Sequence, residues 1–249
     1  MSYRHVTDRA DYADFAGGAV LRSAPGFPAF PVRLGSEIFQ RATALRGDGR
    51  PAVVWDPCCG SGYLLTVLGL LHRRSIGAVL ATDAAEPALG LARRNLALLD
   101  PQALQERAAE LDARAEEFGK PSYREAAESA RRLGRTLAEY GGPLPVGVRR
   151  ANAFDREELA AAVAAAGYVP DLVLTDVPYG EQTDWLGADA DTDAGVPEML
   201  AAVAAALPDH AVLAVTVRGR RVPLGGVRAR ESFKIGTRAV ALLTADQLR

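Results

Sequence analysis

The fold of this chain is decided by the stretch VVWDPCCGSG at residues 53–62. It begins as an apolar run typical of a buried strand, passes through a glycine-containing turn, and leads into the apolar stretch 63–71. A strand, a glycine turn and a helix in this order form a nucleotide pocket at the carboxyl edge of a parallel sheet. A second apolar run, DLVLTDVPYG at residues 171–180, also ends in a turn. The two stretches predict an α/β domain with a binding site at the ends of these strands.

Strand and helix patterns alternate along most of the chain. Strand-like runs cover residues 52–55, 78–82, 146–150, 172–175 and 211–217, and helix-like runs cover 63–71, 87–99, 156–166 and 196–207. The apolar runs at 233–235 and 240–243 favour a closing antiparallel pair. We therefore expect a seven-stranded, mostly parallel sheet with an antiparallel last strand and helices on both faces.

Two segments lie outside this alternation. Residues 1–49 form an N-terminal extension with a helix-like run at 35–45, and residues 101–142 form a charged helical insertion broken near Gly119. The rest, 50–249, is predicted to be one domain, because 249 residues with 49% hydrophobic content suffice for one large core. The extension, with Phe27 and Phe30, covers a cofactor, contacts RNA or packs locally. The insertion is a solvated face or a docking surface.

Composition excludes several function classes. The net charge of −2 gives no overall positive field, so any contact with nucleic acid must come from a local patch. Cys58 and Cys59 are the only cysteines, and because they are adjacent they cannot join distant segments or complete a zinc site. The sequence has no run of about eighteen apolar residues and no signal-peptide pattern. We expect a cytoplasmic protein with no membrane partner and no metal requirement.

The glycine turn separates several classes of nucleotide site. Gly60 and Gly62 let the backbone turn sharply and approach a ligand. A dinucleotide fingerprint needs a small residue where this chain has Leu65, and the Gly-Lys-Ser/Thr of a P-loop is absent. A hydrolase nucleophile elbow needs glycine in place of Cys59, so Ser61 is interpreted as a turn residue.

Polar residues also follow the second and third predicted strands. Asp83 ends the second strand, about twenty residues after the glycine turn, where an acid accepts the hydroxyls of a ribose. Its alternative role is to cap the next helix. After the third strand, Asn152 is the better placed partner for an adenine amino group and Asp155 the second, although either one is also suited to cap the helix that follows.

Together these residues resemble the motifs of Rossmann-type S-adenosylmethionine methyltransferases that act on nucleic-acid amino groups. The resemblance rests on residues 56–62, Asp83, Asn95 and the Asp176-x-Pro-Tyr turn, and it spans about residues 50 to 245. It implies S-adenosylmethionine as cofactor. The cofactor-binding residues that it implies are Asp56, Pro57, Cys59, Gly60, Ser61, Gly62, Asp83, Ala84, Asn152 and Ala153. The catalytic residues that it implies are Asp176, Pro178 and Tyr179.

The whole chain also resembles the avilamycin-resistance family of ribosomal RNA methyltransferases. This resemblance implies that the substrate is a guanine base of 23S ribosomal RNA, as naked RNA or in the large ribosomal subunit. It also implies resistance to avilamycin-type (orthosomycin) antibiotics. Two positions depart from the wider methyltransferase pattern: Cys58 stands where relatives often carry the first glycine of the loop, and Val177 replaces the first proline of Asp/Asn-Pro-Pro-Tyr/Phe.

The residue types of the second turn suit methyl transfer to a planar nitrogen. The lone pair of a base amine is spread into the ring, so an acceptor such as Asp176 that pulls on the N–H group makes the nitrogen more nucleophilic. The other requirement is to hold nitrogen and methyl close together and away from water. Tyr179 suits stacking on a flipped base, with turn packing as the alternative for this side chain.

Basic residues gather after the fifth predicted strand. They are Arg218, Arg220, Arg221, Arg228, Arg230, Lys234 and Arg238. The first three, with Trp185, are the predicted RNA-binding residues, and solvated surface charge is the alternative. Trp185 lies in an acid-rich loop at 181–195, whose charges oppose direct contact with phosphate.

Two other functions remain open from sequence. One is methylation of another planar nitrogen, in adenine of DNA or RNA or in a protein glutamine, because the same Asp-x-Pro-Tyr logic serves those targets. The other is a catalytically silent RNA-binding module that has kept the pocket.

Overall fold

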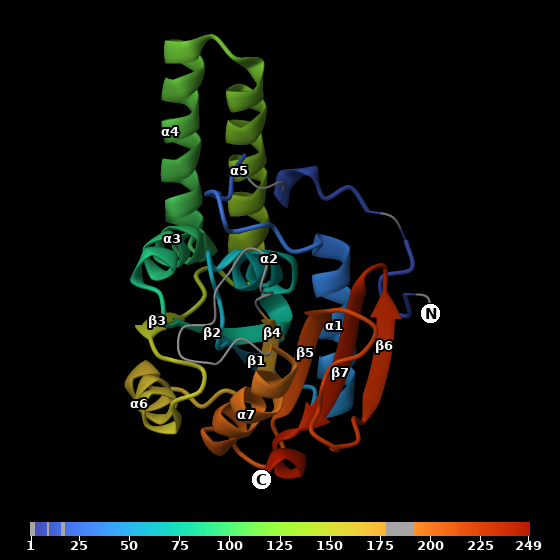
Figure 1. Ribbon diagram of the computed structural model, residues 1–249. Helices are drawn as coiled ribbons and strands as arrows, with labels where there is room; N and C mark the ends of the chain where they lie inside the picture. The colour runs from blue at the N-terminus through green and yellow to red at the C-terminus, as the bar shows by residue number, and fades with distance from the viewer. Residues whose placement is uncertain (1–2, 9, 16–17, 178–191) are drawn as a thin grey trace.

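The computed structural model describes residues 3–8, 10–15, 18–177 and 192–249. Its centre is one seven-stranded sheet in the order β3-β2-β1-β4-β5-β7-β6 (Figure 1). The strands are β1 (Ala52–Asp56), β2 (Ile76–Asp83), β3 (Val146–Arg150), β4 (Leu172–Asp176), β5 (Val212–Arg218), β6 (Glu231–Ile235) and β7 (Arg238–Thr244). Strands β1 to β5 are parallel, whereas β7 runs antiparallel to both of its neighbours. The predicted mostly parallel sheet with an antiparallel last strand is confirmed.

Helices cover both faces of the sheet. One face packs against α1 (Val32–Arg46), α2 (Tyr63–Leu71) and α3 (Glu86–Leu96), and the other packs against α6 (Arg156–Ala166) and α7 (Thr192–Ala205). In β4, Leu172 and Leu174 belong to the first core and Val173 to the second. Because both faces are buried, the central strands consist of nearly continuous apolar residues.

Two long helices occupy the segment between β2 and β3 that follows α3. They are α4 (Pro101–Phe118) and α5 (Pro121–Glu139), and they form an antiparallel pair that projects from the body of the molecule (Figure 1). The side chain of Asp100 caps α4 by accepting a hydrogen bond from the Gln102 N–H group. Gly119 ends the helix with φ of 65°, a conformation that favours glycine.

Some element ends differ from the sequence-based expectation. The helix expected at 87–99 is divided into α3 and the 3₁₀ turn η3 (Ala97–Leu99), and α7 begins at Thr192 with Pro197 inside it. Three other 3₁₀ turns are η1 (Ala13–Phe15), η2 (Arg73–Ser75) and η4 (Ala245–Leu248). Within the described ranges, every helix is too short or too polar to cross a membrane.

Candidate active site

The loop after β1 is held in place by backbone hydrogen bonds to the end of β2. The N–H group of Cys59 donates to the Thr82 carbonyl (3.0 Å), and that of Gly60 donates to the Asp83 carboxylate (2.8 Å). Gly60 and Gly62 have φ of 52° and 70°, so both need the conformational freedom of glycine. A Cβ atom on Gly62 would lie 3.1 Å from Cα of Ala92 in α3. Gly62 therefore permits close packing of α2 on α3, and it is not among the residues that line the cavity described next.

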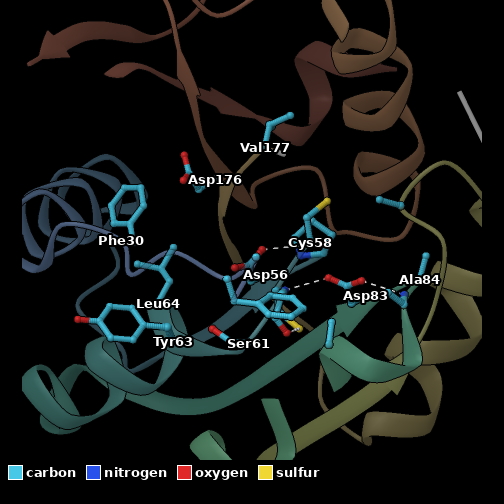
Figure 2. Close-up of a pocket in the computed structure, with 18 of the residues that line it drawn as sticks. Phe30, Asp56, Cys58, Ser61, Tyr63, Leu64, Asp83, Ala84, Asp176 and Val177 are labelled. Atoms are coloured by element: carbon cyan, nitrogen blue, oxygen red, sulfur yellow. Dashed lines mark hydrogen bonds between the residues drawn. The ribbon is translucent and has the colours of Figure 1, made fainter. Parts of the chain in front are cut away.

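A cavity of about 260 Å³ lies above this loop, at the carboxyl ends of β1, β2 and β4. Figure 2 shows Asp56, Asp83 and Asp176 around the cavity, with Phe30, Leu64 and Tyr63 to one side. Predicted site residues that line it are Asp56, Pro57, Cys59, Gly60, Ser61, Asp83, Ala84, Asn152, Ala153 and Asp176. Residues outside the predicted set that line it are Gly26, Phe27, Pro28, Phe30, Cys58, Tyr63, Leu64, Ala85, Ala88, Phe154 and Val177. Pro178, Tyr179 and Trp185 lie outside the described residues.

The lining of the cavity is acidic and apolar. Its charged side chains are three carboxylates, and no arginine, lysine or histidine belongs to the described residues that line it. A polyphosphate would meet repulsion from these acids, whereas a cationic ligand would be attracted. The cavity therefore favours a nucleoside that carries positive charge over a dinucleotide or a nucleoside triphosphate.

Asp83 is anchored by both of its carboxylate oxygens. Oδ2 accepts the Gly60 N–H group (2.8 Å) and Oδ1 accepts the Ala85 N–H group (2.9 Å). A carboxylate has about four lone-pair positions, so two remain for the hydroxyls of a ribose. The alternative role as a side-chain cap is not the one observed, because α3 has Ala85 as its N-cap without any side-chain hydrogen bond.

The residues after β3 divide between the cavity and the next helix. Asp155 is the N-cap of α6, and its Oδ1 accepts the N–H groups of Glu157 (2.9 Å) and Glu158 (3.0 Å). Asn152 lines the cavity instead, and its side-chain oxygen accepts the Phe154 N–H group (3.1 Å). The structure thus leaves Asn152 as the candidate adenine contact and gives Asp155 the capping role.

Asp56 is the most enclosed acid of the site, with 3% of its surface exposed. Its Oδ1 accepts the Cys58 N–H group (3.1 Å). Burial is the main cause that raises the pKa of Asp56 to about 7, with a smaller contribution from the negative charges of Asp83 and Asp176. A carboxyl group with this pKa is partly protonated near neutral pH.

The N-terminal extension supplies one wall of the cavity through residues 18–31, which we call the strap. Phe27, Pro28 and Phe30 of the strap line the cavity. Asn95 in α3, which is fully buried, donates through Nδ2 to the carbonyls of Ser61 (2.9 Å) and Arg22 (3.0 Å). It also accepts the Arg22 N–H group through Oδ1 (2.8 Å). One amide therefore joins the glycine loop to the strap.

The projecting helices hold the same strap from the other side. Arg107 of α4 is 5% exposed and donates to the carbonyls of Val20 (3.0 Å) and Ala19 (3.0 Å). It also pairs with Glu110 (2.9 Å), which in turn pairs with Arg22 of the strap (2.8 Å). The helical pair thus has a structural role beside the cavity that the sequence did not indicate.

The second acid turn ends β4. Asp176 pairs with Arg238 of β7, with 3.4 Å between Oδ2 and Nη2. Arg238 is thus turned toward an acid, although in the sequence it belongs to the group of basic residues that follows the fifth strand. Arg218, Arg220 and Arg221, which we call the arginine rim, are exposed at the end of β5 and just after it.

Within the described residues, no group of three histidine, cysteine or acidic side chains is placed to hold a metal ion. The sheet order with its one reversed strand and the acidic cavity at the carboxyl edge define the class of protein, a Rossmann-like methyltransferase. A family model described as "rRNA methyltransferase AviRa" matches residues 1–238. The chain belongs to this family of ribosomal RNA methyltransferases.

Individual relatives agree with the family assignment. The chain is 55% identical over 246 residues to the 23S rRNA (guanine(2535)-N(1))-methyltransferase of Streptomyces viridochromogenes, covering 98% of this chain and 96% of the relative. Two solved structures of the rRNA methyltransferase aviRa from the same organism each give a TM-score of 0.92. They are 51% and 53% identical and cover 100% of this chain and 98% of their own.

Proposed function

We propose that this protein transfers the methyl group of S-adenosylmethionine to N1 of one guanine in 23S rRNA, the guanine that corresponds to position 2535 in the name of its Streptomyces relative. The observation that carries this proposal is the acidic, phosphate-repelling cavity next to Asp176 in a chain more than half identical to that relative. Methylation at this position protects the ribosome against avilamycin-type antibiotics in our proposal. The protein acts where ribosomes are assembled, in the cytoplasm.

The residues that line the cavity fit S-adenosylmethionine. When bound, this cofactor supplies an electrophilic methyl group on a positively charged sulfur. Asp83 offers its two remaining lone-pair positions to the ribose hydroxyls, and Asn152 with Ala153 faces the adenine. The carboxylate of Asp56 would balance the positive charge of a bound cofactor, and that charge would in turn stabilise the ionised form of this buried acid. Gly62 contributes only by shaping the loop.

Methylation of guanine N1 differs chemically from methylation of an exocyclic amine. N1 is a ring nitrogen that carries a proton, and its lone pair is delocalised toward the adjacent carbonyl. We assign the role of proton acceptor to Asp176, whose side chain is 23% exposed at the cavity. The bound cofactor would supply the methyl group to N1 and would keep the electron pair of the broken carbon–sulfur bond on its sulfur. The N1 proton passes to the Asp176 carboxylate and then to water.

The walls of the cavity support this reaction by excluding water. Phe30, Leu64 and Tyr63 form an apolar side next to the acids (Figure 2). In a site of this kind, charge interactions are stronger than in water and the reactants are held close together. Residues 1–49 are then, in part, a cover of the cofactor, since the strap belongs to this wall.

RNA contacts are proposed for the arginine rim. Arg218, Arg220 and Arg221 are exposed near the carboxyl edge of the sheet, where a flipped base would enter. Their charges suit phosphate groups and position the RNA without reading its sequence. Stacking of the base on Tyr179 and contact with Trp185 remain proposals for residues outside the described part of the chain.

The test is to incubate the protein with labelled S-adenosylmethionine and either naked 23S rRNA or isolated large subunits. N1 of guanine donates a hydrogen bond in Watson–Crick pairing, so methylation there stops reverse transcriptase. We expect label in RNA and a single new stop at the proposed guanine. A transcript with adenine at this position is the control and should show neither. Label without a stop, or label in DNA or in protein glutamine, contradicts the proposal.

A further inference from the structure

Asp176 and Arg238 lie on the same face of the sheet although β5 separates their strands. Asp176 is paired in register with Thr216 of β5, and Thr216 is paired with Val240 of β7. Arg238 stands two residues before Val240, so its side chain leaves the sheet on the side shared by Asp176 and Thr216. This register lets the guanidinium reach over β5 to the acid, with 3.4 Å between Nη2 and Oδ2.

The guanidinium of Arg238 is enclosed, unlike a group that binds RNA phosphates at a rim. Its side chain is 11% exposed, and its central carbon lies 5.0 Å from the ring centroid of Phe30, in a cation–π contact. Nε of Arg238 and the hydroxyl of Thr216 are both buried without a hydrogen-bond partner among the described residues. The Nε donor is therefore still available to a carboxylate that moves closer, as in a two-pronged arginine–carboxylate pair.

We propose that Arg238 is a positioning residue for methyl transfer, which holds Asp176 ionised and directed at the target nitrogen and links it through Phe30 to the wall of the cofactor cavity. This inference rests on the proposed function, in which Asp176 accepts the N1 proton. The contact with Phe30 gives the link a physical basis, because that ring lines the cavity and is 6% exposed.

The crowding of acids at this edge explains why such a residue is needed. Asp56 of β1, Asp83 of β2 and Asp176 of β4 line the same cavity, so each raises the cost of ionising the others. A proton shared by this group is best held by the acid without a cation beside it. Asp56 fits that description, since burial followed by repulsion from Asp83 and Asp176 raises its pKa to about 7. Arg238 leaves Asp176 as the ionised member of the group.

The charged groups around Asp176 define what a pH experiment reports. Among the described residues they include Asp56, Asp83, Arg238 and Arg218, which is paired in register with Arg238. Replacing Arg238 by glutamine removes a cation in direct contact with Asp176 and keeps a side chain that donates hydrogen bonds. Without this cation the ionised form of Asp176 is less favoured, so the acid limb of the kcat profile should move to higher pH.

The experiment compares wild type with Arg238→Gln, Arg238→Lys and the control Arg74→Gln. Arg74 also stacks on an aromatic ring, that of Tyr140 at 4.1 Å, but it belongs to η2 before the amino end of β2. We expect kcat of Arg238→Gln to fall about tenfold to a hundredfold, as for a misplaced catalytic group, with KM for RNA and calorimetric cofactor Kd within about threefold of wild type. Lysine should restore the position of the acid limb and only part of kcat, and Arg74→Gln should match wild type.

Three results would overturn the inference. The first is wild-type kcat and pH profile in Arg238→Gln, and the second is a loss confined to KM for RNA, which would make Arg238 a phosphate contact. The third result concerns the lysine variant, which decides the question if circular dichroism shows that Arg238→Gln does not fold. An acid limb displaced from its wild-type position in Arg238→Lys would overturn the inference. Failure of the proposed function is seen separately, because wild type itself would then give no reverse-transcription stop.

Discussion

Two aspartates end neighbouring strands of the sheet and have opposite surroundings. Asp56, after β1, is 3% exposed, accepts a backbone N–H group, and has its pKa raised to about 7 by burial. The Asp176 side chain, after β4, is 23% exposed and lies beside the Arg238 guanidinium. The same residue type at equivalent positions therefore has two environments, which fit the two roles we propose: Asp56 responds to a cationic ligand, and Asp176 stays charged and meets the substrate.

Removing the charge of Asp176 should have the largest effect on the difference between the two acids. In Asp176→Asn we expect kcat to fall by about 10² to 10⁴, because the proton acceptor is lost, while the calorimetric Kd of the cofactor changes little. Transfer of labelled methyl to 23S rRNA measures the first quantity. Asp209→Asn, an exposed acid paired with Arg249, is the control and should behave as wild type. Activity near the wild-type level in Asp176→Asn would mean that another group takes the proton.

Neutralising Asp56 should have a different effect, on stability and cofactor binding. Its folded pKa of about 7 lies above the ordinary value of 3.8, so its contribution to stability is full below about pH 4 and is lost as pH rises to about 7. Asn keeps the acceptor for the Cys58 N–H group without this loss. At pH 8, Asp56→Asn should therefore unfold at a higher urea concentration than wild type, with a free energy of unfolding larger by on the order of 2 to 4 kcal/mol. It should also bind the cofactor more weakly.

Urea titrations of both proteins at pH 4.5 and pH 8 check this expectation. The gap between them should be small at the lower pH and wide at the higher one. Asp100→Asn, which keeps a helix cap, is the matched control and should follow wild type. An Asp56→Asn protein that is less stable than wild type at pH 8 would show that the buried acid is stabilised in the native state after all.

A smaller effect is expected from loosening the wall that both acids share. Arg107→Gln weakens the hold on the Ala19 and Val20 carbonyls without altering any residue of the cavity. We expect the cofactor Kd to rise about tenfold, which corresponds to about 1.4 kcal/mol. Amide hydrogens of residues 18–31 should exchange faster. Arg131→Gln, which removes the ion pairs with Asp112 and Glu128 within the same helical hairpin, should leave both quantities unchanged.

What could be predicted from sequence was what is encoded locally. The strand that ends at Asp83 and the turn at Gly60 lie within short runs of sequence whose pattern predicts the element and where it ends. The structure places both residues at the cavity. The alternation of such runs likewise predicted the sheet. Gly62 is an exception among these locally encoded residues, because it was predicted to bind the cofactor and does not line the cavity. Its role depends on the close approach of Ala92, which lies far away in the sequence, in α3.

The rest depends on contacts between segments far apart in the chain. Arg238 and Asp176 are separated by 62 residues, and nothing around Arg238 distinguishes it from the other basic residues of its segment. The sequence left the role of the N-terminal extension open, because aromatic residues beside prolines fit local packing as well as a cofactor wall. The hydrogen bonds to Arg107 and Asn95 help to hold the strap at the cavity, and these join positions more than 70 residues apart.

The side-chain amide of Asn95, which joins the glycine loop to the strap, should affect the rate of product release as well as the shape of the cavity. Because one side chain holds both the Ser61 carbonyl and the strap, the glycine loop and the cover cannot shift independently. Under the proposed function, release of the spent cofactor would require these hydrogen bonds to open together while the sheet stays intact. We expect the rate of product release to follow the local opening of residues 18–31 and to be set apart from the global stability of the protein.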